Sequence, residues 1–123
     1  MERACGFTRT ERIKKKKEFT RVYNDGKRYS NGQINLYFKT TQQDDPGGTQ
    51  TKIGIVASRK VGNAPERNYL KRVIREVFRT KKNSFKQTVQ LVVVLKPAAR
   101  SVTGEDLGRG FLELCRKARL ISI

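Results

Sequence analysis

The sequence predicts an α+β fold, a two-layer sandwich in which a small four-stranded sheet packs against three helices, mainly on one side. Three observations predict it. Segments with helical and with strand periodicity follow one another in the order α-β-β-β-α-β-α. One strand segment is apolar on both faces, which is typical of a central strand. The 123 residues contain no internal repeat and no interdomain linker, so we expect one domain.

The first 15 residues predict a basic arm that precedes the folded domain. Between Arg12 and Lys17 only Ile13 is uncharged, and the segment lacks the apolar stretch of a signal peptide. We therefore expect an arm over residues 1–15 and a single domain over residues 16–119.

A short helix is expected over residues 16–24. Phe19, Val22 and Tyr23 follow the i, i+3, i+4 spacing of one helical face. Gly26 suits the end of such a helix.

Two strands are expected over residues 33–40 and 52–58, with a short strand at Tyr29 and Ser30 before them. The first of the two alternates between an apolar and a polar face. Its apolar face holds Ile34, Leu36 and Phe38, and its polar face holds Gln33, Asn35, Tyr37 and Lys39. The loop between the two strands has Asp-Asp-Pro-Gly-Gly turn chemistry, so we expect them to pair antiparallel.

Asn63 begins the second helix. Asn is a favoured N-cap, Pro65 is tolerated in the first turn, and Glu66 stands three residues after the cap. We expect this helix to run to about Arg79.

The last two elements are a buried strand and a third helix. Residues 89–95 are nearly all apolar and rich in β-branched side chains, which favours a central strand that ends before Pro97. Thr103 then suits an N-cap, with acidic residues in the first turn. The apolar stripe of this helix consists of Leu107, Phe111, Leu114, Cys115 and Ala118.

The composition indicates a polyanionic partner rather than side-chain catalysis. Lys plus Arg number 28 against 11 Asp plus Glu, a net charge of +17, and there is no His. Cys5 and Cys115 are far apart, which excludes a Cys/His zinc site and argues against a disulfide framework. No apolar run approaches the roughly 18 to 20 residues of a membrane span. We expect a cytoplasmic protein without a membrane or a small-molecule substrate among its partners.

The densest signal lies in residues 59–79, where seven side chains are Lys or Arg and two are Glu. At about 100° per residue the apolar side chains share one arc and most basic ones share the adjoining arc. Such a row of cations suits a phosphate backbone. The candidates for RNA contact are Arg59, Lys60, Asn63, Arg67, Asn68, Lys71, Arg72 and Arg75. The alternative is a solvated helix face with Glu partners, although the acids are too few to neutralise the row.

The turn at Val61, Gly62 and Asn63 is weaker evidence. Backbone N–H groups at a helix start can hold a phosphate. A plain cap and turn is the alternative interpretation of these three residues.

Aromatic side chains between cations suggest a site for single-stranded nucleic acid, in which bases stack while charges follow the backbone. Phe19 and Tyr23 are spaced i, i+4 on the first helix, and Tyr37 lies beside Asn35 and Lys39 on the polar face of its strand. A core stripe is the alternative for Phe19, whereas its polar companions favour exposure of Tyr37. The candidates are Phe19, Tyr23, Tyr37 and Lys39.

Residues 57–79, ASRKVGNAPERNYLKRVIREVFR, resemble the signature of the bacterial ribonuclease P protein component, roughly S-K-K-x-G-N-A-x-x-R-N-R-x-K-R-x-x-R-E-x-F. The resemblance spans about residues 7–118, and its central motif is long and specific. Outside the motif it rests on Arg12 to Lys15, Phe19, Val22, Tyr23, Gly26, Ile53 to Ile55, Val92 and Lys96 to Ala98.

The resemblance implies a sandwich with an unusual left-handed β-α-β crossover, which general handedness rules do not predict. It also implies a subunit of ribonuclease P, the endoribonuclease that removes the 5′ leader of precursor tRNA to give the mature 5′ end. In this family the RNA supplies the active site, and Mg²⁺ held mainly by the RNA is the cofactor. We therefore expect no catalytic and no metal-binding residue in the chain, with ribonuclease P RNA and precursor tRNA as partners.

Carried over position by position, the resemblance also implies roles for the candidate residues. Those that match the basic motif facing the catalytic RNA are Arg67, Asn68, Lys71 and Arg72, preceded by the basic pair Arg59 and Lys60. Those that match the aromatic positions of the leader cleft are Phe19, Tyr23 and Tyr37, which favours a functional Phe19 over a mere core stripe. The family is similar in using basic residues to offset repulsion between two RNAs, which lowers the Mg²⁺ requirement.

Tyr69 departs from the family pattern, because it occupies the second Arg of the family's Arg-Asn-Arg. One forked phosphate contact is lost there. Base stacking or a hydroxyl contact are two hypotheses for what replaces it.

Two other classes of function stay open at this point. A structural RNA-binding protein of ribosomal type explains the charge, but neither an aromatic cleft nor the long motif. A stand-alone metal-dependent nuclease needs clustered carboxylates. The acidic pairs at residues 44–45 and 105–106 are better explained as turn and cap residues.

Overall fold

The computed structural model describes residues 13, 16–40, 51–81, 84–85 and 89–121. Most of the predicted arm and of the loop after the first long strand lies outside these residues. The elements are α1 (Lys16–Asp25), β1 (Lys27–Ser30), β2 (Ile34–Thr40), β3 (Lys52–Ala57), α2 (Ala64–Lys81), β4 (Val89–Leu95), the short 3-10 helix η3 (Pro97–Ser101) and α3 (Gly104–Lys117). The predicted order is confirmed.

The four strands form one mixed sheet in the order β1-β2-β4-β3. β4 pairs antiparallel with β2 and parallel with β3, so the expected antiparallel pairing of residues 33–40 with 52–58 is wrong. The physical reason lies in β4, whose side chains are all buried except the half-buried Val94. A strand that is apolar on both faces is stable in the middle of a sheet, between two neighbours.

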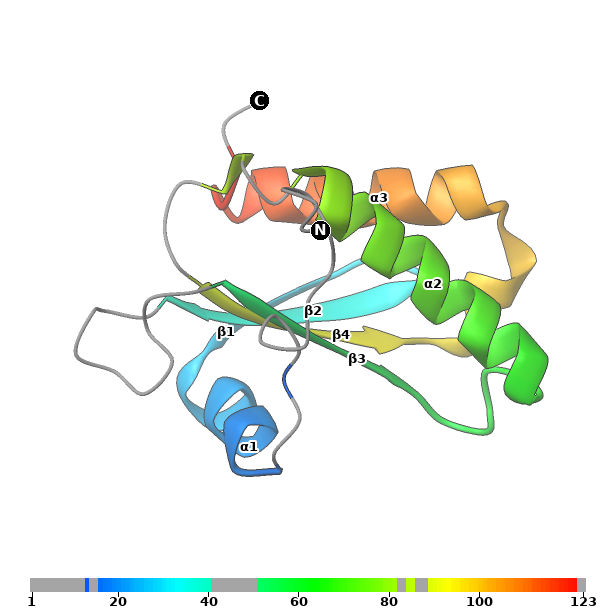
Figure 1. Ribbon diagram of the computed structural model, residues 1–123, viewed down its shortest axis with the longest axis horizontal. Helices are drawn as coiled ribbons and strands as arrows, with labels where there is room; N and C mark the ends of the chain where they lie inside the picture. Colours follow the sequence, from blue (N-terminus) through cyan, green and yellow to red (C-terminus); the bar gives the residue numbers. More distant parts are fainter. Residues whose placement is uncertain (1–12, 14–15, 41–50, 82–83, 86–88, 122–123) are drawn as a thin grey trace, which may run out of the picture.

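Helices cover both faces of this sheet. α2 and α3 lie together on one face, and α1 lies alone on the other (Figure 1). The prediction that helices pack mainly on one side is confirmed by α2 and α3, and α1 forms a separate small layer.

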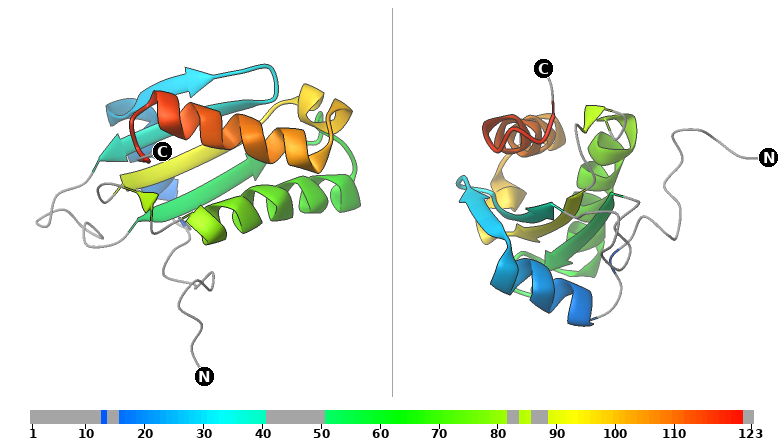
Figure 2. Two further views of the ribbon diagram at one scale, coloured as in Figure 1. Left: turned by 90° about the horizontal axis from the view of Figure 1, so that it is seen from above. Right: turned by 90° about the vertical axis from the view of Figure 1, so that its left-hand side faces the viewer.

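The connection from β3 through α2 to β4 is left-handed. In the left view of Figure 2, α2 lies in front of the sheet, both parallel strands run to the right, and β4 lies above β3. A right-handed crossover would place β4 on the other side of β3. The handedness that the family resemblance implied is therefore present.

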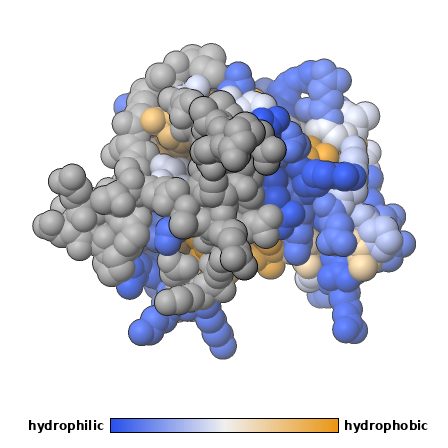
Figure 3. All heavy atoms as spheres, viewed as in Figure 1, coloured by the Kyte–Doolittle hydropathy of each residue, from blue (hydrophilic) through white to orange (hydrophobic). Residues whose placement is uncertain are grey.

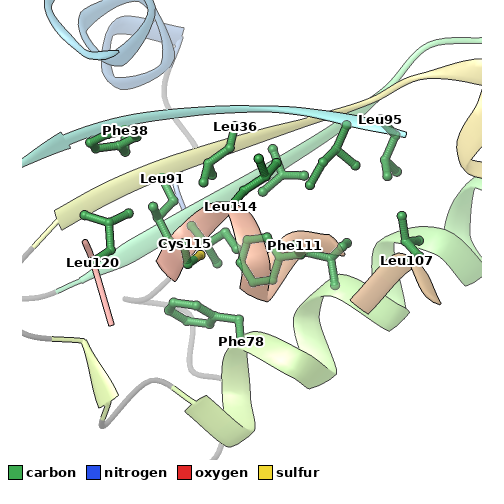
Figure 4. Packing of buried hydrophobic residues seen from close by; sticks show 14 of the residues in the cluster. Leu36, Phe38, Phe78, Leu91, Leu95, Leu107, Phe111, Leu114, Cys115 and Leu120 are labelled. Carbon is green, nitrogen blue, oxygen red and sulfur yellow. The ribbon is translucent and has the colours of Figure 1, made fainter. Parts of the chain in front are cut away.

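The main core lies between the sheet and the α2–α3 layer. Phe78 of α2 and Phe111 and Leu114 of α3 point toward Leu36 and Leu91 of the sheet (Figure 4). All five side chains are buried, with exposures of 4% or less. No helix in the described part of the chain is long and apolar enough to span a membrane.

A smaller apolar cluster lies beneath α1, on the opposite face of the sheet. Its buried members are Ile13, Val22 and Val92. Backbone N–H of Ile13 donates to the carbonyl of Ile53 at 2.9 Å, so residue 13 lies along the edge of β3. The half-buried side chains packed on this cluster are Phe19, Tyr37, Val56 and Val94. Two of the sequence candidates thus lie on this face.

Candidate RNA interface

Three aromatic candidates lie on the α1 face of the sheet, and we call Phe19, Tyr23 and Tyr37 the aromatic patch. The rings of Tyr23 and Tyr37 contact edge to face, with centroids 4.8 Å apart and an interplanar angle of 84°. Tyr23 is 38% exposed and Tyr37 is half-buried. The pair therefore presents aromatic surface to solvent from two elements that are distant in the sequence.

Phe19 packs on the sheet, as the core alternative for this residue expects. A Cβ added to Gly54 would lie 2.7 Å from Cε1 and 2.8 Å from Cζ of Phe19, so this ring lies directly on the backbone of β3. The ring packs on the cluster beneath α1 but stays half-buried. Phe19 is thus a core side chain at the rim of the aromatic patch.

The titration of Tyr23 follows from its position. Partial burial, and secondarily the neighbouring Tyr37, raise the pKa of Tyr23 above its ordinary value. The phenol therefore stays neutral at physiological pH and can donate a hydrogen bond as well as stack.

Arg28 is a cation beside the patch that the sequence analysis missed. It stands opposite Tyr37 in the antiparallel β1–β2 register, and directly opposed residues share one face of a sheet. Its side chain is exposed. The two basic residues that begin β1 were the available signal, but only the register connects Arg28 with Tyr37.

Lys39 follows Tyr37 by two residues and shares its face of β2. Its side chain lines a hollow at the junction of α1, β1 and the end of α3, together with Asp25, Lys27 and Ala118. The structure therefore places Lys39 at the end of the strand, beside this hollow rather than in the ring contact.

The start of α2 is held by a reciprocal pair of hydrogen bonds. Glu66 backbone N–H donates to Asn63 Oδ1 at 2.9 Å, and Asn63 backbone N–H donates to Glu66 Oε1 at 2.8 Å. This is the predicted capping box. It engages the carboxamide oxygen of Asn63, so the cap interpretation of this residue is confirmed.

The basic candidates of α2 lie on the flank away from α3. Tyr69, Val73 and Val77 mark the α3 flank, because they approach Gly104 and Gly108 of α3. The candidate side chains on the other flank and the outward face are Arg67, Asn68, Lys71, Arg72 and Arg75, of which Asn68 and Arg72 are exposed. Hydrophilic side chains gather over α2 in Figure 3. The helix thus displays the row that its sequence predicts.

Arg67 has an unusual environment within this row. It is half-buried, and its Nε is buried without a hydrogen-bond partner. An unpaired donor of a charged group is costly, and a phosphate oxygen is a suitable acceptor for a guanidinium. Arg59 and Lys60 add two exposed cations in the turn before α2.

The two glutamates of α2 contact arginines outside the candidate set. Glu66 lies 3.5 Å from Arg100 of η3, and Glu76 lies 2.8 Å from Arg79. Both pairs are exposed, so each contributes little to stability. Glu76 thus neutralises the last cation of the 59–79 row, whereas Glu66 contacts an arginine outside that row.

An α+β fold with a cationic helix and a partly exposed aromatic pair defines the class of RNA-binding proteins. Comparison with known proteins agrees. The model of the Ribonuclease P family matches residues 7–119. The chain therefore belongs to the ribonuclease P protein family, and as such is the protein component of a tRNA-processing endoribonuclease that works with ribonuclease P RNA.

Individual relatives support the assignment along nearly the whole chain. The ribonuclease P protein component of Clostridium novyi (strain NT) is 35% identical over 113 residues, covering 91% of this chain and 96% of the relative. That of Bacillus pumilus (strain SAFR-032) is 34% identical over 107 residues, covering 87% of each. The structure of the Staphylococcus aureus protein superimposes with a TM-score of 0.81 at 28% identity, covering 91% of this chain and 98% of that one.

Proposed function

We propose that the chain binds ribonuclease P RNA through α2 and the turn before it, while the aromatic patch holds the 5′ leader of precursor tRNA. One observation carries this proposal. The basic row of α2 and the aromatic patch lie on opposite faces of the same sheet (Figure 1). A protein with this arrangement can contact two RNA segments at once without one displacing the other.

The α2 surface suits the backbone of a folded RNA. Arg67, Lys71 and Arg72 project from one rigid helix, and arginine forks match phosphate oxygens in two-point contacts. Contacts of this kind position an RNA without reading its sequence. Their strength should fall steeply with salt, because each neutralised phosphate releases counterions.

The aromatic patch suits a single strand. The exposed surfaces of Tyr23 and Tyr37 offer stacking to unpaired bases, and Arg28 stands opposite Tyr37 to follow the backbone. Each stacked base contributes about 1 to 3 kcal/mol. A single-stranded leader therefore fits this face better than a duplex does, because duplex bases are already stacked on one another.

In this proposal the RNA carries out the cleavage, with Mg²⁺ as the cofactor that the RNA holds. Among the described residues, no group of three or more Cys, Asp or Glu side chains comes together that could hold a metal ion. The chain's contribution is to lower the repulsion between two polyanions, which reduces the Mg²⁺ that the complex needs. We place this reaction in the cytoplasm.

The proposal is tested by cleavage of a precursor tRNA at low Mg²⁺. The three arms are the protein alone, a bacterial ribonuclease P RNA alone, and both together. We expect cleavage at the mature 5′ end only in the combination. Absence of stimulation over the RNA alone would refute the proposal and favour a structural RNA-binding protein. Cleavage by the nuclease-treated protein alone would favour a protein nuclease.

Two sets of variants separate the two surfaces. The pair Tyr23→Ala and Tyr37→Ala should raise the KM of long-leader substrates and leave assembly with the RNA unchanged. The pair Lys71→Ala and Arg72→Ala should weaken assembly for every substrate. If both pairs act identically, the two surfaces do not have separate roles.

A further inference from the structure

Tyr69 is an exposed aromatic side chain outside the aromatic patch. Its relative exposure is 48%, and only Tyr23 joins it as an exposed large hydrophobic side chain in the part of the chain that the structure describes. Exposed aromatic rings on a cationic surface are a common means of holding unpaired bases. The exposed ring of Tyr69 is therefore a second candidate for contact with an unpaired base.

The hydroxyl end of Tyr69 lies against the start of α3. A Cβ added to Gly104 would lie 2.6 Å from Tyr69 Oη and 3.6 Å from its Cζ. The hydroxyl end of the side chain thus lies close to the backbone of α3, in space that only glycine leaves open. Since the hydroxyl is directed toward α3, the ring is the part that remains for an incoming ligand.

The charges around Tyr69 permit an RNA to approach. Arg72 follows one helical turn later and is exposed. The nearby carboxylates face arginines: Glu66 lies 3.5 Å from Arg100. Glu105 and Asp106 share Arg109, at 3.6 and 3.1 Å. The surface therefore combines a fixed ring with an available cation and no isolated acid among these groups.

We propose that Tyr69 is a stacking site for an unpaired base of ribonuclease P RNA, with Arg72 contacting the adjoining phosphate. The inference rests on the proposed RNA surface of α2 and extends it to the flank that meets α3. It selects stacking over a hydroxyl contact, the two hypotheses for the position where the family pattern has arginine. The ring is oriented before binding, so little side-chain freedom is lost when a base stacks on it.

The test compares Tyr69→Phe with Tyr69→Leu, using a transcribed bacterial ribonuclease P RNA as the probe and the full-length chain. Phenylalanine keeps the ring and lacks the hydroxyl, whereas leucine fills space over Gly104 and lacks the aromatic face. We expect the affinity of Y69F to stay within about twofold and that of Y69L to fall roughly 5- to 150-fold. The slope of log affinity against log salt should not change, because no charge is removed.

Three results would overturn the inference: Y69L binding like the wild type, Y69F losing as much affinity as Y69L, or a shallower salt slope in Y69L. Thermal unfolding of each variant checks the fold, and Tyr69→Met serves the same comparison if leucine prevents folding. Tyr29→Leu is the matched control, because the Tyr29 ring packs on Phe38 outside both proposed RNA surfaces, and it should leave RNA affinity intact. If the wild-type chain itself fails to bind this RNA, the proposed function fails rather than the role of Tyr69.

Discussion

Replacing Gly54 by alanine should lift Phe19 off the sheet and weaken the hold on a leader. The added Cβ would lie 2.7 Å from Phe19 Cε1 and 3.2 Å from Ile13 Cβ, whereas ordinary contact begins at 3.4 Å. The ring must therefore withdraw by about 0.7 Å, or the backbone of β3 must move. Overpacking of this kind lowers the free energy of unfolding by about 1 to 3 kcal/mol.

The assay compares two substrates in the reconstituted holoenzyme, one with a long leader and one with a single-nucleotide leader. Because Phe19 lies at the rim of the aromatic patch, its displacement should raise the KM of the long-leader substrate on the order of fivefold. The short-leader substrate should be cleaved as by the wild type. A general loss of stability would instead affect both substrates alike.

A matched control comes from the other face of the sheet. A Cβ at Gly108 would lie 2.8 Å from Val77 Cγ2, so Gly108→Ala overpacks the α2–α3 contact by a similar amount. It should destabilise the fold without any dependence on leader length. Adding Phe19→Leu to Gly54→Ala should recover stability but not leader binding. Equal effects of Gly54→Ala on both substrates would refute the positioning of Phe19 by Gly54.

Three further predictions concern the cap, the basic row and the buried thiol. Asn63→Ala should lower the free energy of unfolding by about 1 kcal/mol in urea titrations, whereas Asn63→Ser should not; equal stability of all three would contradict the capping role. Arg72→Ala should reduce the slope of log affinity against log salt for RNA binding by about 0.7 to 0.9. Arg109→Ala is the control and should leave this slope unchanged, because Arg109 contacts two acids of α3. A reduced slope in Arg109→Ala and an unchanged slope in Arg72→Ala would place the RNA on α3. Burial raises the pKa of the Cys115 thiol from 9.0 to about 12. The buried neutral thiol therefore contributes fully to the free energy of unfolding below pH 9, and this contribution is lost as the pH rises toward 12. In a Cys5→Ser variant at pH 8, a thiol reagent should modify Cys115 only after unfolding, and rapid reaction of the native protein would contradict this.

The candidate site was predictable wherever the signal was local. The capping box and the basic row of α2 each depend on spacing within one helix, and both are present as predicted. The Tyr23–Tyr37 contact joins two elements, and the sequence indicated its members only as separate candidates. Arg28 was missed because its place opposite Tyr37 comes from strand register, which no local pattern reports.

The sequence by itself determined the order of the elements, their approximate ends and the family. Residues 89–95 show this well, since a run of apolar β-branched side chains predicted both the bounds of β4 and its burial. Only the tertiary structure decided that β4 lies between β2 and β3 and that α1 covers the second face. It also decided that Phe19 packs on Gly54 and that Tyr69 lies against Gly104. Hydrophobic periodicity specifies which face of an element is buried, whereas packing between whole elements selects the partner that buries it.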